Sequence, residues 1–251
     1  MSIQIKNVSK QFGNKTVLSN VNLTIQNARC TCLLGRNGAG KSTLINILSN
    51  LYSPTIGNIF INDMTYANNE SAIKQIIGVL PEKLPLIGEW NVNNYLNFVC
   101  ILRGISKKES DQRITSLVQY FFDDDPVNEK TINTLSFGMK VKLAICASMI
   151  HNPSIVIWDE PFTGIDPFSS EIIVKFVNNC IDSGKTFFIS SHNLQYVDKI
   201  ATDICIIDEG KIVYSSTYNE FTQNGKLEIE ASLFSKLQWQ PNEKGALQWI
   251  F

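Results

Sequence analysis

The sequence predicts an α/β fold with a mainly parallel sheet, and two patterns support this fold class. Residues 35–43 fit the phosphate-binding pattern G-x-x-x-x-G-K-[ST], with an apolar run before them and a helical pattern after them. Further apolar runs at 154–161 and 186–190 alternate with helical patterns, which is typical of parallel strands covered by helices on both faces. With 251 residues and 44% hydrophobic content, the chain can form one large domain with a proper core.

The overall composition excludes several classes of protein. The net charge is −1 and the isoelectric point is about 6.1, so we expect no nucleic-acid partner. No apolar run is long enough to span a membrane, and the first residues show no signal-peptide pattern, so we expect a soluble protein. The six scattered cysteines and two histidines favour buried thiols in a reducing cytoplasm over a zinc site.

Three segments of alternating apolar and polar residues predict an antiparallel sheet beside the phosphate-binding loop. They cover residues 3–8, 17–25 and 56–63. Phe12 falls on the loop before the second segment. An exposed aromatic ring at this place can stack on a nucleobase, whereas a buried ring would fill the turn or the core; stacking is favoured once a nucleotide site is granted.

Residues 84–150 predict a helical subdomain inserted between two strands of the main sheet. The strand before it, at 76–80, ends at Pro81. Within the insertion, apolar residues recur at the spacing of a helix face. The three predicted helices cover 92–102, 111–122 and 136–150.

Two loops of the insertion differ in character. Residues 84–90 are apolar but interrupted by proline and glycine, which favours a partner surface over a core element. The acidic run at 123–126 ends the second helix and predicts a solvated loop.

After the insertion, strands and helices alternate again, and a hairpin closes the main domain at about residue 220. The predicted tail, 221–251, contains a short helix at 227–237. The aromatic residues Trp239, Trp249 and Phe251 beyond it either pack back on the domain or contact a partner. The predicted elements before the tail are strands at 154–161 and 186–190, helices at 166–181 and 194–201, and a hairpin of 204–207 with 211–214.

The phosphate-binding loop supplies both backbone and side-chain groups for an anion. Its glycines let the backbone turn so that N–H groups point inward, and the following helix N-terminus adds partial positive charge. Lys41 is placed to reach the β- and γ-phosphates, and the Ser42 hydroxyl to hold Mg²⁺. The other predicted contacts are Gly35, Arg36, Asn37, Gly38, Ala39, Gly40 and Thr43.

Three further polar residues follow buried strands. Asp159 and Glu160 end one apolar run, and His192 follows the next. Because parallel strands present their carboxyl ends on one edge of a sheet, we expect these residues to meet the phosphate-binding loop. Asp159 can then hold Mg²⁺, Glu160 can act as general base, and His192 can contact the γ-phosphate; a plain loop histidine is the alternative.

Together these motifs resemble those of ATP-binding cassette (ABC) ATPases, and the resemblance covers roughly residues 1–220. Residues 135–139 read Leu-Ser-Phe-Gly-Met, which is similar to the family signature Leu-Ser-Gly-Gly-Gln except at Phe137 and Met139. The resemblance implies a P-loop NTPase core in which Ser136 and Gly138 contact ATP held by a second subunit. Ser136 would also be a helix N-cap, which is the simpler interpretation.

The resemblance also assigns two carboxylates. It places Asp166 in the loop that joins the two ATP sites of a dimer, and Glu82 at the hinge between the core and the helical subdomain. Most members have Gln where this chain has Glu82, but a carboxylate can still bind Mg²⁺, so we expect activity to survive. Glu at this place resembles bacterial exporter subunits.

The function implied by the resemblance is Mg²⁺-ATP hydrolysis that drives an exporter. Two copies, or one copy and a homologue, would close on two ATP molecules and move a separate transmembrane permease, whose cytoplasmic helix enters a groove near residues 84–90. The chain would then lie on the cytoplasmic face of a membrane. The alternatives are a soluble ABC ATPase of the iron–sulphur assembly type and a non-catalytic nucleotide sensor, although the intact Lys41, Asp159, Glu160 and His192 argue against a sensor.

Overall fold

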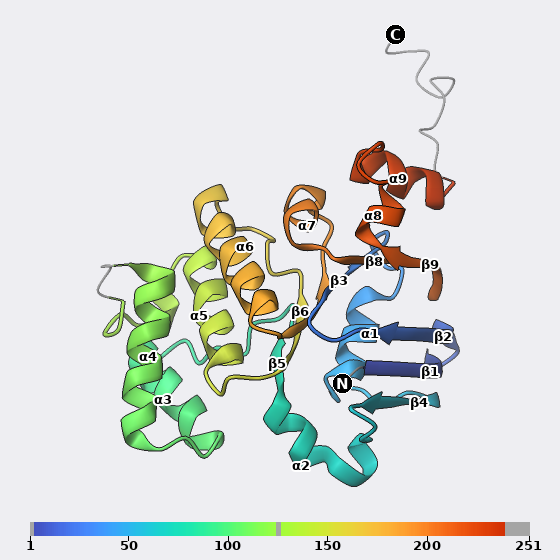
Figure 1. The fold of residues 1–251 in the computed structure, drawn as a ribbon. Helices are drawn as coiled ribbons and strands as arrows, with labels where there is room; N and C mark the ends of the chain where they lie inside the picture. The colour runs from blue at the N-terminus through green and yellow to red at the C-terminus, as the bar shows by residue number, and fades with distance from the viewer. Residues whose placement is uncertain (1–2, 124–126, 239–251) are drawn as a thin grey trace, which may run out of the picture.

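Two β-sheets and the helices around them make up the structure, a computed structural model that describes residues 3–123 and 127–238 (Figure 1). The first sheet is antiparallel: β1 (Ile3–Phe12) lies between β2 (Lys15–Ile25) and β4 (Ile56–Ile61). The predicted antiparallel sheet is therefore confirmed. The prediction that Phe12 lies on a loop is wrong, because Phe12 is the last residue of β1 and pairs with Lys15 across the turn.

The second sheet confirms the mainly parallel α/β prediction. Within the described residues its strand order is β5-β6-β7-β3-β8-β9, and all neighbours are parallel except the hairpin of β8 and β9. The strands are β3 (Cys30–Leu34), β5 (Ile77–Leu80), β6 (Ile155–Asp159), β7 (Thr186–Ser190), β8 (Asp203–Asp208) and β9 (Lys211–Thr217).

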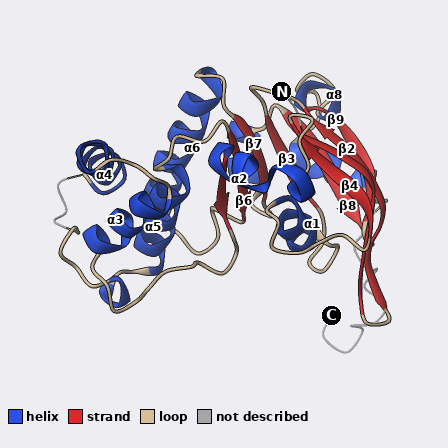
Figure 2. Cartoon of the chain, turned by 90° about the horizontal axis from the view of Figure 1, so that it is seen from below, coloured by secondary structure: helices blue, strands red, loops and turns tan. Residues whose placement is uncertain are grey.

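Both faces of this second sheet are covered, and consecutive strand residues enter different cores. In β6, Trp158 packs with helices α5 (Phe137–Met149), α6 (Pro167–Asp182) and α7 (Leu194–Ile200), whereas Ile157 packs with α1 (Lys41–Leu48) and the antiparallel sheet. Figure 2 shows α1 and α6 on opposite sides of these strands. Because no face meets water, β3, β6 and β7 are buried along their whole length and are mostly apolar.

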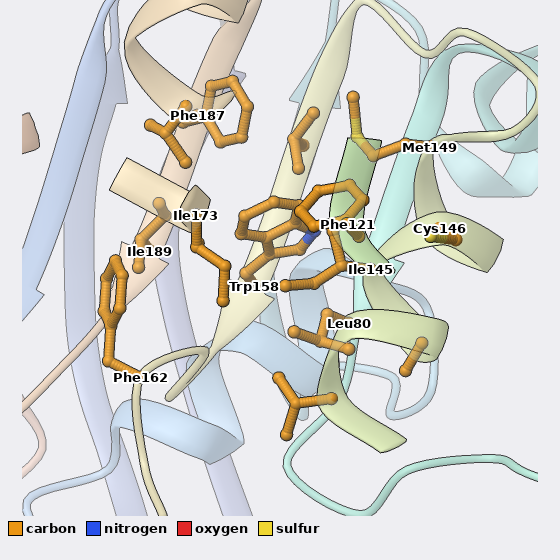
Figure 3. Packing of buried hydrophobic residues seen from close by; sticks show 14 of the residues in the cluster. Leu80, Phe121, Ile145, Cys146, Met149, Trp158, Phe162, Ile173, Phe187 and Ile189 are labelled. Atoms are coloured by element: carbon orange, nitrogen blue, oxygen red, sulfur yellow. The ribbon is translucent and has the colours of Figure 1, made fainter. Parts of the chain in front are cut away.

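Trp158 is the centre of the larger core (Figure 3). Its ring is fully buried, stacks on Phe176 of α6 and meets the edge of Phe187 of β7. Its Nε1 donates a hydrogen bond of 3.1 Å to the Ser148 hydroxyl of α5, so the one polar atom of the indole is satisfied. Trp158 therefore joins α5 and α6 to the strand that ends in Asp159.

The helical subdomain lies between β5 and β6 in sequence and beside them in space (Figure 1). It contains α3 (Val92–Leu102), α4 (Lys107–Phe122), a 3₁₀ turn (Ile132–Thr134) and α5. α4 begins earlier than predicted because Ser106 caps it by accepting a hydrogen bond from the backbone N–H of Glu109. In the acidic run, residues 124–126 lie outside the described residues, so the predicted loop stays a prediction.

Helix α2 (Tyr66–Ile76) was not predicted from the sequence. Only Ile73 of this helix is buried, so the apolar periodicity that identifies a helix is weak. Near the C-terminus, α8 (Tyr218–Phe221) and α9 (Ile229–Lys236) follow β9, and α9 confirms the predicted short helix. Trp239, Trp249 and Phe251 lie outside the described residues.

The six cysteines agree with the expectation from composition. All six cysteines are buried, as predicted, and carry free thiols. The two closest, Cys30 and Cys32, have sulfur atoms 3.9 Å apart. Over residues 3–123 and 127–238, we find no helix with the length and apolar character needed to cross a bilayer.

Candidate functional site

The phosphate-binding loop connects the buried strand β3 to helix α1, as predicted. Gly35 passes so close to β8 that a Cβ built on it would lie 2.2 Å from the Ile207 carbonyl oxygen, so only glycine fits. Gly40 occupies the N-cap of α1 with φ +111°, and no side chain caps the helix. The first N–H groups of α1 are therefore open to an anion, and the helix dipole favours one there.

Lys41 is held close to this loop. Its side chain is only 7% exposed, and Nζ donates hydrogen bonds to the carbonyl oxygens of Gly35 (2.9 Å) and Arg36 (3.3 Å). Both acceptors belong to the loop itself, so no carboxylate neutralises the ammonium group within these contacts. The positive charge is thus already positioned where a phosphate would enter.

Asp159 occupies the end of β6 and is 3% exposed. Its carboxylate accepts a hydrogen bond from the hydroxyl of Ser190, at the end of the neighbouring strand β7, and the Ser42 hydroxyl is close enough to lower its pKa. Burial raises the pKa of Asp159, the two hydroxyls oppose this rise, and the nearby Glu82 and Glu160 carboxylates add to it. A bound cation would relieve this crowding of negative charge.

The oxygen atoms in this region fit a magnesium ion. The Ser42 hydroxyl and the Glu82 carboxylate are both close enough to Asp159 to affect its pKa. All three line the same cavity. Hard oxygen ligands from one or two carboxylates, completed by phosphate oxygens and water, are what Mg²⁺ prefers.

Glu160 and His192 form the second polar contact of the site. Glu160 Oε2 accepts hydrogen bonds from His192 Nδ1 (2.8 Å), from the His192 backbone N–H (3.2 Å) and from the Thr163 hydroxyl (3.3 Å). The backbone of Glu160 has φ +53°, an unfavourable conformation for a residue with a side chain. Its N–H donates to the carbonyl and the hydroxyl of Ser190 (3.1 and 3.0 Å), which hold it there.

A cavity of about 720 Å³ collects these groups. It brings together Lys41 and Ser42, at the start of α1, with Asp159, Glu160 and His192, at or just beyond the ends of β6 and β7. Sequence reasoning missed Lys15, Val17, Phe137 and Thr163, which also line it, and Ser190, whose register opposite Asp159 is visible only once the strands are paired. The other predicted residues in its wall are Asn37, Gly38, Gly40, Thr43 and Glu82.

Comparison with known proteins identifies the family. A family model described as "ABC transporter" matches residues 18–163, which is more than half of the chain. The chain belongs to the ABC transporter family. It is an ATPase, and within that family it is the ATP-binding subunit of a transporter.

Individual proteins agree with this assignment. The chain is 31% identical over 234 residues to the lantibiotic transport ATP-binding protein SrtF of Streptococcus pyogenes, covering 93% of this chain and 99% of that one. It is 31% identical over 215 residues to the linearmycin resistance ATP-binding protein LnrL of Bacillus subtilis, covering 86% and 69%. A solved structure described as the ATP binding subunit of an ABC transporter superposes with a TM-score of 0.84 at 25% identity, covering 95% and 98%.

In this ABC subunit, the predicted contacts to a second ATP, Ser136, Gly138 and Asp166, are not among the residues that line the cavity. Ser136 is exposed and caps α5, with its hydroxyl accepting from the Met139 N–H at 3.2 Å. Asp166 is exposed and caps α6 by accepting a hydrogen bond from the Ser169 N–H at 2.9 Å. The backbone N–H and the side chain of Ser169 both lower the pKa of Asp166. The N-cap interpretation of Ser136 therefore describes what it does within a single chain.

Phe12 also lies outside the cavity wall. Its ring is 43% exposed and makes an edge contact with Tyr52, with centroids 5.4 Å apart. The Lys10 ammonium lies 4.9 Å from the Phe12 ring centroid. Lys15, which pairs with Phe12 across the hairpin, does line the cavity, so Phe12 is adjacent to the site rather than within it.

Proposed function

We propose that this chain hydrolyses Mg²⁺-ATP to drive an ABC exporter, with Glu160 as general base. The observation that carries the proposal is the contact of Glu160 with His192 in the same cavity as Lys41 and Asp159. A general base must have a carboxylate or imidazole positioned beside the reacting phosphate. The names of the relatives SrtF and LnrL, lantibiotic transport and linearmycin resistance, support export of an antimicrobial compound.

In this proposal, each residue of the cavity has a separate role in hydrolysis. The N–H groups at the start of α1 and the Lys41 ammonium bind the phosphates. Ser42, Asp159 and Glu82 would hold Mg²⁺, which neutralises charge on the phosphate oxygens when bound. Glu160 takes a proton from the attacking water, and His192 orients Glu160 through Nδ1 and leaves its other nitrogen free for the γ-phosphate.

We infer that a second ATP-binding subunit completes each site. Ser136, Gly138 and Asp166 do not line the cavity of their own chain, and the first and last are exposed. The N-terminus of α5 carries the N–H groups that suit a phosphate, so a second subunit could offer its ATP to them. One chain carries both the cavity residues and Ser136, Gly138 and Asp166. A homodimer, or a heterodimer with a homologue, could therefore form two complete ATP sites.

The partner in the membrane would be a separate permease subunit. A groove of about 700 Å³ has a mixed lining. Its apolar residues are Leu84, Leu86, Ile87, Ile132 and Phe137, and its polar residues are Glu82, Lys83, Glu89, Asn133 and Lys140. Next to it, Trp90 meets the edge of Phe98 of α3 at 5.2 Å, and the last residues of α3, Ile101 and Leu102, are 73% and 67% exposed. An apolar surface of this kind suits a helix of a partner protein.

This arrangement gives the chain its proposed location and domain organisation. The chain would lie on the cytoplasmic face of a membrane, held by the permease. Residues 1–220 would form the ATPase domain, with residues 84–150 as its helical subdomain, and residues 221–251 would form the tail.

Replacing Glu160 by Gln tests the role of the general base. The amide keeps the size of the side chain but cannot accept a proton, so we expect turnover to fall by roughly 10²–10⁴-fold. ATP binding, measured by calorimetry, should persist. Glu171→Gln is the matched control, because Glu171 is half-exposed and pairs with Lys199 away from the cavity. Unchanged turnover in Glu160→Gln would exclude Glu160 as the base.

Purification from membranes tests the partner. A tagged chain should copurify with a multi-span membrane protein from a detergent extract, and the double variant Ile101→Asp/Leu102→Asp should lose that protein. Val213→Asp, at a half-exposed apolar position of β9, should keep it. Recovery of soluble proteins alone would favour the soluble ABC ATPase instead.

A further inference from the structure

Phe137 is the first residue of α5 and carries a large apolar side chain beside the ATP site. Its side chain is 53% exposed, so it contributes little to the core. It lines the ATP cavity of about 720 Å³ and also the neighbouring groove of about 700 Å³. The ring therefore forms part of the wall between the two.

The ring packs on the loop that follows Glu160. A Cβ built on Gly164 would lie 2.9 Å from Phe137 Cε1 and 3.0 Å from Cδ1, so the ring rests directly on the Gly164 backbone. A second contact lies alongside: a Cβ built on Gly138 would lie 3.3 Å from Ile165 Cγ2. The start of α5 and the loop at 160–166 are thus in contact at two places.

The other side of the same loop contacts the carboxylate of Glu160. The Thr163 hydroxyl donates to Glu160 Oε2 at 3.3 Å, and the Thr163 N–H donates to the Glu160 carbonyl at 3.2 Å. Gly164 follows directly, with φ +71° in an exposed stretch of backbone. A glycine in such a stretch has many accessible conformations, and a neighbouring ring reduces them.

We propose that Phe137 is a positioning residue for Glu160, acting through Gly164 and Thr163. Glu160 itself has an unfavourable backbone conformation, which persists only where the surroundings enforce it. Ser190 accepts the hydrogen bond of the Glu160 N–H, and Thr163 donates hydrogen bonds to the carboxylate and the carbonyl of Glu160. The ring of Phe137 keeps the second of these supports in place. This inference rests on the proposed role of Glu160 as general base.

Steady-state kinetics of the purified full-length chain test the proposal. Phe137→Ala should lower kcat about 10-fold with KM unchanged within about twofold, since a small misplacement of a catalytic group reduces rate rather than binding. Thr163→Val should have a similar effect, and Phe137→Tyr, which keeps the ring, should retain most of kcat. Val213→Ala, which truncates a similarly exposed apolar side chain on β9, should behave like the parent.

A double-mutant cycle separates positioning from a general structural role. If Phe137 acts through Glu160, adding Phe137→Ala to Glu160→Gln should leave the residual single-turnover rate unchanged within about twofold. Multiplicative losses would overturn the proposal, and so would an increase in KM at constant kcat. Thr163→Val keeps the test decisive if Phe137→Ala does not fold. If Glu160→Gln itself keeps full turnover, the proposed function fails; if it loses turnover but Phe137→Ala does not, only this inference fails.

Discussion

The residues proposed to contact ATP fall into an inner group and an outer group, which have different environments. The inner group, Lys41 and Asp159, is 7% and 3% exposed; Lys41 hydrogen-bonds to the carbonyl oxygens of the phosphate-binding loop, and Asp159 to the Ser190 hydroxyl. The outer group, Ser136 and Asp166, is exposed and caps helices. The inner group is therefore complete in one chain. The outer group has its hydroxyl and carboxylate directed to its own backbone, and in the proposed dimer it would contact the ATP of another subunit.

The two aspartates show how strongly the environment decides the chemistry. Burial beside other carboxylates raises the pKa of Asp159, so this group gains from a cation. Backbone N–H donors lower the pKa of the exposed Asp166, so it stays charged without one. The same side chain is thus suited to metal binding in the inner group and to helix capping in the outer group.

The largest expected effect belongs to the inner group. Lys41→Ala should weaken ATP binding by about 1.5–3 kcal/mol, the usual contribution of a hydrogen bond to a charged group, or roughly 10–150-fold in Kd. Calorimetry on dilute protein measures this, with the exposed Lys211→Ala as control. Because the inner group is complete in one chain, the loss should not depend on protein concentration. Unchanged affinity would remove the phosphate-binding loop from the site.

The outer group should behave in the opposite way. Ser136→Ala should leave ATP binding to the dilute chain within about twofold, but should lower turnover about 10–100-fold at concentrations where subunits pair, because a hydrogen bond to a charged phosphate is lost. Ser106→Ala is the matched control, since Ser106 caps α4 in the same way, and it removes the capping contribution of about 1 kcal/mol without touching ATP. Equal effects of Ser136→Ala and Ser106→Ala on turnover would show that Ser136 acts only as a helix cap.

The inner group was also the more predictable one from the sequence. Asp159 ends the buried strand β6, and Lys41 comes after β3 and the phosphate-binding loop; His192, in the same cavity, follows β7. Because parallel strands bring their carboxyl ends to one edge, the meeting of these residues followed from topology. Ser190 could not be found in this way, because its contact with Asp159 depends on strand register. Helix α2 was missed because a helix with a single buried residue leaves too little apolar periodicity in the sequence.

The pH dependence of Mg²⁺-ATP binding should again separate the two groups. Metal binding needs an ionised Asp159, so acidification through its raised pKa should weaken binding by up to about tenfold per pH unit. Ser190→Ala removes a hydrogen bond that favours the ionised form, so the decline should begin at higher pH. Asp166→Asn should leave the profile unchanged.

Calorimetric titrations over a pH series, in a Glu160→Gln background that slows hydrolysis, measure this effect. ATP itself also binds protons over this pH range, but this contribution is the same for each variant and cancels when their binding profiles are compared. A profile that does not move in Ser190→Ala would contradict the link between Asp159 and the metal.

Phe12 gives the smallest expected effect. It fits neither group, because it is exposed like the outer group yet lies beside the cavity of its own chain. If its ring stacks on the base, Phe12→Ala should weaken ATP and GTP binding alike by about 0.5–1.5 kcal/mol, or roughly 2–12-fold, because every base has an aromatic face. Phe12→Tyr should bind normally. Tyr52→Ala removes the edge contact of 5.4 Å and the contact of the Tyr52 ring with the Lys10 ammonium, and it should leave affinity unchanged within about twofold. If Phe12→Ala lowers the free energy of unfolding instead and leaves Kd unchanged, Phe12 is a packing partner of Tyr52. The exposed residues would then make no contact with the ATP of their own chain, and exposure would be enough to distinguish the outer group from the inner group.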